Sequence, residues 1–151
     1  MGHPNHRIAA GGIVINGRKI LLVRYRDGKS TYLVAPGGRM EDGESLADAA
    51  QREVEEETGV QCKTRWPVMI DNLKTTRYQM VKIWYLCDYL AGDPILTPDA
   101  EKEGIIEVGW YTDEDLYNET VFPEIVQSMK IDALSELKNG IIDSGIRTTR
   151  W

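Results

Sequence analysis

The sequence feature that most constrains this chain is the segment AAQREVEEETGV at residues 49–60, which has the pattern of a helix that ends at a glycine. Ser45 followed by Asp48 resembles a capping box, the arrangement that begins many helices. Gly59 is typical of the position just past a helix end, where the backbone turns left-handed. We therefore predict a helix from about Ser45 to Thr58.

Four glutamates place like charge beside the apolar stripe of this helix. Each residue advances about 100° around the helix axis, so Glu53 lies one turn from Glu56 and Glu57, whereas Glu55 points towards solvent. Glu53, Glu56 and Glu57 lie at the edge of the helix's apolar stripe, where mutual repulsion and desolvation oppose ionisation of their carboxylates. The stripe is formed by Leu46, Ala50 and Val54. A divalent cation would relieve that conflict, since Mg²⁺ takes oxygen ligands. Spacing alone leaves a solvated acidic face as the alternative.

The loop before the helix adds specificity to this pattern. Residues 38–60 follow the pattern G-x5-E-x7-R-E-U-x-E-E-x-G-U, in which U is aliphatic, and every specified position matches. This segment resembles the signature box of the Nudix hydrolase family. The APGG sequence before it and the EVGWYTDEDL sequence after it also look like the flanks of that box, so the resemblance extends over most of the chain.

The resemblance implies an α+β fold, with an α/β/α sandwich around a mixed β-sheet. It also implies a Mg²⁺-dependent hydrolase, with Mn²⁺ as a possible substitute. Such an enzyme cleaves a nucleoside diphosphate linked to a group X into a nucleoside monophosphate and phosphorylated X. The metal ligands that the motif implies are Glu53, Glu56 and Glu57. A main-chain carbonyl at Gly37 or Gly38 could add another ligand, because glycine allows close approach to the backbone.

Other charged residues have supporting catalytic roles under this resemblance. Arg52 lies four residues before Glu56 and can orient that carboxylate through a charge-assisted hydrogen bond. Glu44 would fix the loop or reach a metal ion through water. The family often places one more acidic residue in a distal loop, as a ligand or general base; the candidates are Glu101, Glu103 and Glu107. We favour Glu103, since the KEG sequence lies shortly before a strand that contains tryptophan.

The sequence indicates the residues that would contact the substrate less clearly than it indicates the metal ligands. Cationic side chains that could hold a phosphate are Arg24, Arg26, Arg39, Arg77 and Lys82. Arg39 is the best placed of them, because it lies inside the metal loop. Tyr78 lies 18 residues after Val60, a spacing similar to that in family members that cleave dinucleoside polyphosphates, and its ring could stack on a base.

Composition limits the possible partners and location. The chain has 24 acidic and 18 basic residues, and its net charge of −6 argues against a nonspecific nucleic-acid binder. No apolar stretch approaches the roughly 20 residues that span a bilayer, and the start lacks a convincing signal peptide. Cys62 and Cys87 are too few for a disulfide scaffold, so we expect both to be reduced strand residues. We expect a cytoplasmic protein that binds a small nucleotide, without a membrane or a stable nucleic-acid complex.

The 151 residues fit a single domain, which we predict over 1–151 with about the first six residues disordered. The Asn16-Gly17 pair predicts a hairpin. The predicted strands cover 7–15, 19–26, 31–35, 60–73, 79–92 and 105–111, a short helical turn covers 112–116, and a longer helix covers about 123–138. Residues 141–151 could pack on the sheet or against a partner chain. A homodimer is expected by analogy with the family.

Two substrate classes remain open within this function. The compact length slightly favours a nucleoside triphosphate or an oxidised deoxynucleoside triphosphate over ADP-ribose or another nucleotide sugar. The proline associated with ADP-ribose-cleaving members is absent, since Thr75 and Thr76 occupy that region. A module that senses a nucleotide without turnover is the alternative of another class; such proteins typically lose box carboxylates, whereas this chain keeps them. An acidic interaction domain is a weaker third reading.

Overall fold

The computed structural model describes residues 5–148 of the chain. Its strands are β1 (His6–Asn16), β2 (Lys19–Asp27), β3 (Ser30–Val34), β4 (Gly37–Arg39), β5 (Gln61–Lys74), β6 (Gln79–Ala91), β7 (Ile105–Tyr111), β8 (Val121–Phe122) and β9 (Ile142–Thr148). Its helices are α1 (Leu46–Thr58), α2 (Pro98–Lys102), α3 (Glu124–Ser128) and α4 (Ile131–Ser135).

The described strands form one mixed sheet in the order β8-β3-β2-β1-β6-β5-β9, with β4 paired to β1 and β7 paired to β2. Strand β1 runs parallel to β6 and antiparallel to β2 and β4. One end of β1 pairs with β2 at Ile15↔Ile20, whereas its other half pairs with β4 at Ala9↔Arg39. Strand β4 therefore enters the sheet beside the middle of β1, next to the start of α1.

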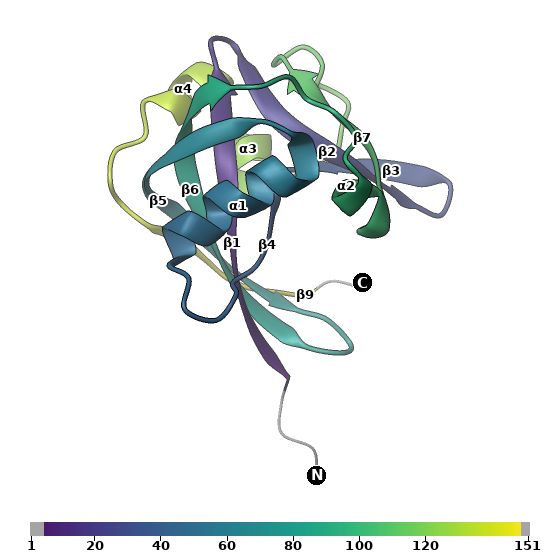
Figure 1. Cartoon of the computed structure of the whole chain (residues 1–151), viewed down its shortest axis with the longest axis vertical. Helices are drawn as coiled ribbons and strands as arrows, with labels where there is room; N and C mark the ends of the chain where they lie inside the picture. Colours follow the sequence, from purple (N-terminus) through teal and green to yellow (C-terminus); the bar gives the residue numbers. More distant parts are fainter. Residues whose placement is uncertain (1–4, 149–151) are drawn as a thin grey trace.

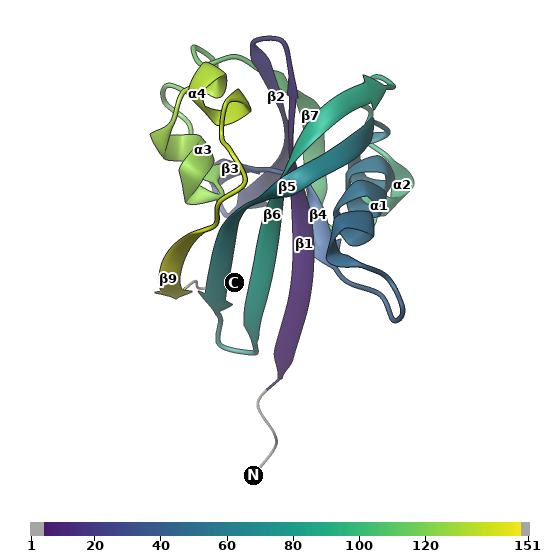
Figure 2. The ribbon, with the colours of Figure 1, turned by 90° about the vertical axis from the view of Figure 1, so that its left-hand side faces the viewer.

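The sheet lies between two helical layers. Figure 2 shows α1 and α2 on one side of the strands and α3 and α4 on the other. Alternate residues of β1 face these two layers: Ile13 packs in the cluster that contains Ile125 and Leu134, whereas Val14 packs in the cluster that contains Val54 of α1. The predicted mixed sheet and α/β/α layering are therefore confirmed (Figure 1).

The predicted helix over 123–138 is wrong. Two short helices, α3 and α4, replace it, because the chain is extended at Met129 (φ −123°, ψ 147°) and at Lys130 (φ −72°, ψ 153°). The backbone N–H of Ile131 donates a hydrogen bond to the Asp113 carboxylate at 3.1 Å. That contact satisfies one donor at the start of α4 and comes from a segment 18 residues away, which local sequence cannot show.

Smaller differences concern short elements. The strands β4 and β8 and the helix α2 have no counterpart among the predicted elements. Thr97 before Pro98 is a recognisable helix start, so the sequence does contain a signal for α2. Asn5 and His6 lie beside β6, since the Gln79 N–H donates to the Asn5 C=O at 3.0 Å and His6 pairs with Gln79; residues 1–4 lie outside the described part.

Other expectations agree with the structure. The segment at 112–116 forms hydrogen-bonded turns, with Leu116 N–H donating to Thr112 C=O. Strand β9 pairs with β5 and so extends the sheet of its own chain. Both cysteines are buried and free. None of the described helices has the length and apolar character that a membrane span requires.

Candidate active site

Helix α1 presents its glutamates because both of its ends are fixed. Ser45 Oγ accepts the Asp48 N–H at 3.1 Å, and Gly59, with φ 74°, donates its N–H to Glu55 C=O at 2.9 Å. Within the helix, Val54 is buried in the core and Glu55 is exposed. The predicted helix, caps and solvent direction of Glu55 are confirmed.

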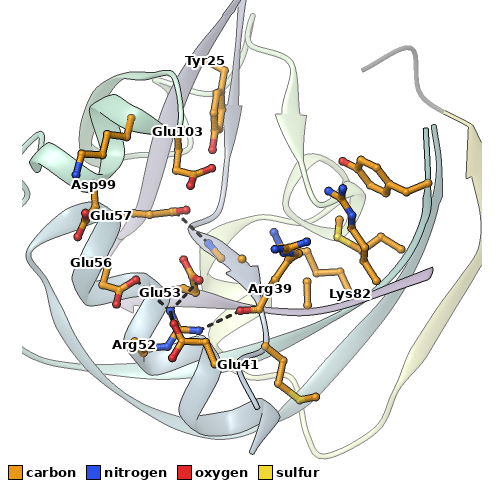
Figure 3. A pocket seen from close by; sticks show the side chains of 18 residues that line it. Tyr25, Arg39, Glu41, Arg52, Glu53, Glu56, Glu57, Lys82, Asp99 and Glu103 are labelled. Atoms are coloured by element: carbon orange, nitrogen blue, oxygen red, sulfur yellow. Dashed lines mark hydrogen bonds and ion pairs between the residues drawn. The ribbon is translucent and has the colours of Figure 1, made fainter. Parts of the chain in front are cut away.

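The other glutamates of α1 open into a pocket of about 740 Å³. Carboxylates and cations share its wall, which makes it strongly polar (Figure 3). Its acidic residues are Glu41, Glu53, Glu56, Glu57, Asp99 and Glu103, and its basic residues are Arg7, Arg39, Arg52, Lys82 and Lys102. A ligand that carries negative charge together with a dication would match such a wall.

Arg52 ties the acidic residues of this pocket together. Its guanidinium donates to both oxygens of Glu44 at 2.8 Å, to Glu53 at 2.9 Å and to Glu56 at 3.0 Å. It also donates to the Arg39 carbonyl at 3.0 Å, which fixes the loop against the helix. Hydrogen bonds from Arg52 lower the pKa of Glu44 to about 2. The predicted bond to Glu56 is present, and the wider network makes Arg52 a positioning residue.

The Gly38 backbone lies close to the Glu53 carboxylate. A Cβ at Gly38 would lie 2.5 Å from the Glu53 Cδ and 2.6 Å from each carboxylate oxygen. Desolvation by burial raises the pKa of Glu53, while its bond to Arg52 opposes that rise. The missing side chain therefore makes room for a carboxylate that is mostly sheltered from water.

Glu57 is buried beside a buried lysine. Its side chain is only 4% exposed, and it accepts the Gly37 N–H at 3.2 Å. Burial raises its pKa to about 8, and the charge of Lys82 opposes that rise. Burial lowers the pKa of Lys82, which Glu57, Glu53 and Asp71 oppose. A bound dication would favour the ionised form of Glu57, because it adds positive charge.

Helix α2 brings the distal acidic residue to the pocket. Thr97 Oγ1 caps α2 by accepting the Ala100 N–H at 3.0 Å, and it also donates to the Glu56 carbonyl of α1. Of the three candidates, Glu103 lines the pocket. Glu107 instead accepts the Tyr111 hydroxyl at 2.5 Å, and Glu101 does not line the pocket.

Two of the four expected substrate-binding residues line the pocket, and two do not. Arg39 and Tyr78 line the pocket. Arg24 lies elsewhere and is held by both carboxylate oxygens of Glu119, at 2.9 and 3.1 Å. Arg26 is exposed at the end of β2 and does not line the pocket. The structure therefore gives no support to phosphate contacts by Arg24 or Arg26.

Several pocket residues carry no signal in the local sequence. Tyr25 reaches the pocket from β2, Asp99 and Lys102 reach it from α2, and Arg7 reaches it from β1. Arg7 lies 3.9 Å above the Tyr78 ring because β1 runs parallel to β6. No local pattern marks this long-range pairing. Lys82 was noted only as a cation, and its isolated charge on a strand with apolar neighbours was the available signal.

The donor set fits a hard dication by its chemistry. Glu53, Glu56 and Glu57 supply carboxylate oxygens, and the glycine backbone at 37–38 lies against two of them. Across residues 5–148, however, no three His, Cys, Asp or Glu side chains already converge on one point. Arg52 instead holds Glu53 and Glu56. Coordination by all three would therefore require side-chain rotation away from Arg52.

Comparison with curated proteins gives partial matches. The chain is 33% identical to the mouse (Mus musculus) 8-oxo-dGDP phosphatase NUDT18 over 86 residues, which is 57% of this chain and 25% of that protein. It is 30% identical to the ADP-ribose pyrophosphatase of Methanocaldococcus jannaschii over 103 residues, which is 66% of this chain and 60% of that protein. The chain thus covers less than two thirds of the length of these relatives.

Comparison with solved structures concerns the fold alone. A NUDIX hydrolase from Nitrosomonas europaea superposes with a TM-score of 0.70 at 19% identity, covering 98% of this chain and 82% of that one. A family model described as the NUDIX domain matches residues 5–130. That match covers most of the chain and includes the whole motif at 38–60, so the chain belongs to the Nudix family.

Proposed function

We propose that this protein is a Mg²⁺-dependent pyrophosphohydrolase that cleaves a nucleoside diphosphate linked to X into a nucleoside monophosphate and phosphorylated X. The observation that carries this proposal is the pocket in which Glu53, Glu56, Glu57 and Glu103 face a common space lined also by cations. Mn²⁺ can replace Mg²⁺, since both accept carboxylate oxygens.

Residues in and beside the pocket have distinct roles in this reaction. Glu53, Glu56 and Glu57 hold the metal ions, together with a main-chain carbonyl at 37–38. When bound, these ions neutralise the diphosphate and polarise its P–O bonds. Arg52 positions the carboxylates, and Glu44 anchors Arg52. Arg39 supplies positive charge for the substrate phosphates.

The bond changes follow from attack by water on one phosphorus of the diphosphate. The water oxygen forms a new bond to that phosphorus, the bond from phosphorus to the bridging oxygen breaks, and the bridging oxygen leaves with the other phosphate. The proton of the water passes to a carboxylate, for which Glu103 is our candidate, because it lines the same pocket as the carboxylates of α1.

For the substrate, we favour an ordinary or oxidised nucleoside triphosphate over a nucleotide sugar. The activities that the two relatives are named for differ, since one acts on 8-oxo-dGDP and the other on ADP-ribose. A panel that contains nucleoside di- and triphosphates, their 8-oxo forms and ADP-ribose separates these classes by the products released.

The decisive assay measures phosphate, pyrophosphate and nucleotide release with Mg²⁺ in wild type, Glu56→Gln and Glu55→Gln. Glu55→Gln is the matched control, since it makes the same change on the solvent side of α1. We expect turnover by wild type and Glu55→Gln and a fall of at least 100-fold in Glu56→Gln. If no variant turns over any substrate while a nucleotide raises the melting temperature, a sensing module replaces this proposal.

A second pair of variants tests the proton acceptor. Glu103→Gln should lower kcat and change the acidic limb of the pH–rate profile, whereas Glu107→Gln should leave both unchanged. Equal effects of the two changes would remove Glu103 from the role.

A homodimer, a single domain over 1–151 and a cytoplasmic location remain predictions. Sedimentation equilibrium tests the dimer, limited proteolysis tests the single domain, and fractionation of cells tests the location.

A further inference from the structure

Arg7 lines the active-site pocket, where its guanidinium lies 3.9 Å above the Tyr78 ring. Within residues 5–148, the Arg7 side chain makes no hydrogen bond or ion pair, and its Nε is buried without an acceptor. A buried N–H donor without an acceptor opposes folding, so a guanidinium that is held in this way requires an explanation. An anion in the pocket would provide one.

The strand register places Arg7 away from the carboxylates of α1. In β1, Ala10 pairs with Gly38, whose backbone lies against the Glu53 carboxylate. Arg7 lies three residues earlier in the same strand, roughly 10 Å along it. Tyr78 directly precedes β6, which runs parallel to β1, so contact with its ring keeps the guanidinium at this distance. One end of the pocket therefore holds carboxylates, and the other end holds Arg7.

Two other cations of the pocket wall are matched by carboxylates. Arg52 donates hydrogen bonds to two glutamates of α1. Burial lowers the pKa of Lys82, and three negative charges oppose that fall, those of Glu57, Glu53 and Asp71. These cations serve carboxylates of the protein, whereas the charge of Arg7 is available to a ligand.

Arg39 adds a second charge near Arg7. It pairs with Ala9, which lies two residues from Arg7 on the same face of β1, and it lines the same pocket. Arg39 is exposed, and Figure 3 shows it across the pocket from Asp99 of α2. The acidic residues of the wall come from α1, from the loop before it and from residues 99–103; among the described lining residues, β1 and β6 contribute none. This end of the pocket therefore favours an anion.

The Tyr78 ring supports the cation. A guanidinium above the face of a ring is attracted to it but keeps its positive charge. Because Arg7 covers this face, the ring cannot also stack there on a base. The planar forks of Arg7 and Arg39 match phosphate oxygens, and two positive charges match a phosphate dianion.

We propose that Arg7, together with Arg39, binds a second phosphate group of the substrate, a monoester that a sugar or similar spacer separates from the scissile diphosphate. The monoester belongs to the nucleoside ribose or to X. Successive phosphates of one unbranched chain would all lie close to the metal ions, whereas Arg7 lies roughly 10 Å further along β1. This inference rests on the proposed function for the position of the scissile diphosphate.

The test measures ligand binding with Mg²⁺ by calorimetry in wild type, Arg7→Gln, Arg7→Lys and Arg18→Gln. The ligands form sets that differ by one phosphate: AMP with adenosine 2′,5′- and 3′,5′-bisphosphate, and ribose 5-phosphate with ribose 1,5-bisphosphate. Inorganic phosphate is a separate ligand. Arg18→Gln is the matched control, since the Arg18 side chain is 86% exposed and does not line the pocket. Hydrolysis of the nucleotide panel is measured on the same preparations.

We expect at least one bisphosphate to bind wild type more tightly than its parent monophosphate, by about tenfold or more. Arg7→Gln should abolish this preference, and Arg18→Gln should keep it. Arg7→Lys should reduce it by about threefold or more, because an ammonium keeps the charge above Tyr78 but lacks the planar fork. The set that shows the preference assigns the monoester to the ribose or to X.

Three results would overturn the inference: no preference in wild type, an equal preference in Arg7→Gln, or an affinity for inorganic phosphate equal to that for the bisphosphates. If Arg7→Gln does not fold, an undiminished preference in Arg7→Lys would overturn it. If the preference behaves as expected but no nucleotide is hydrolysed, the phosphate site stands and the proposed function fails. Hydrolysis without the preference would leave the proposed function and remove the phosphate site.

Discussion

Gly38→Ala tests the geometry of the site through one added methyl group. The new Cβ would lie 2.5 Å from the Glu53 Cδ, whereas ordinary contacts begin near 3.4 Å, so the carboxylate must move by about 1 Å. Backbone strain does not contribute, because Gly38 is not among the glycines with positive φ. The effect of the substitution is therefore local to the carboxylate.

The magnitude follows from the displacement. A shift of about 1 Å in a catalytic group can cost about 100-fold in rate, or about 2.7 kcal/mol of barrier. We expect kcat to fall by about that factor at saturating Mg²⁺ and the Mg²⁺ affinity to fall as well. Because Glu53 borders an open pocket, it can rotate, and the free energy of unfolding should change by less than about 1 kcal/mol.

The assay compares initial rates, Mg²⁺ calorimetry and urea unfolding of wild type, Gly38→Ala and Gly109→Ala. Gly109 is a matched strand glycine, and a Cβ there would meet the Tyr111 ring at an ordinary 3.5 Å. We expect the control to keep its rate. A Gly38→Ala protein with kcat and Mg²⁺ affinity within twofold of wild type would refute the reasoning about Glu53.

Three further substitutions test the supports of the site. Thr97→Ala removes the cap of α2 and its bond to the Glu56 carbonyl, so urea unfolding should show a loss of about 1–2 kcal/mol and initial rates should fall; an unchanged midpoint and rate would contradict this. Gly59→Ala places a Cβ at a left-handed backbone position, 2.8 Å from Ile95 Cγ1. The free energy of unfolding should therefore fall by about 1–2 kcal/mol or more, and a loss of less than about 0.5 kcal/mol would contradict this. The pKa of Glu44 is lowered from 4.5 to about 2 by Arg52, so its stabilisation is complete above pH 4.5 and is lost as the pH falls towards 2. Unfolding measured between pH 5 and pH 2.5 should therefore show a weaker pH dependence in Glu44→Gln than in wild type, and identical slopes would argue against the Arg52 bond.

The local parts of the site could be predicted from the sequence. The caps at Ser45 and Gly59, the solvent direction of Glu55 and the Arg52–Glu56 bond depend on residues within one helix. Each follows from helix periodicity and capping rules, which need no tertiary information. The same applies to the strands with strong alternation.

The remaining parts depend on contacts between distant segments. The break between α3 and α4 involves Asp113, and the second face of the pocket requires β1 to lie parallel to β6. Arg24 carries the same charge as Arg39, yet Glu119 holds it outside the pocket. Composition and local spacing contain no information on these pairings, so the face of the pocket that β1 and β6 form was not foreseen.

The central claim is that the carboxylates of α1 hold divalent cations at the site of reaction. The most direct measurement is calorimetric titration of Mg²⁺ and Mn²⁺ into wild type, Glu53→Gln and Glu55→Gln, without substrate. The account predicts saturable binding to wild type and Glu55→Gln and at least tenfold weaker binding to Glu53→Gln. Absence of binding to wild type, or equal affinity in all three proteins, would contradict it.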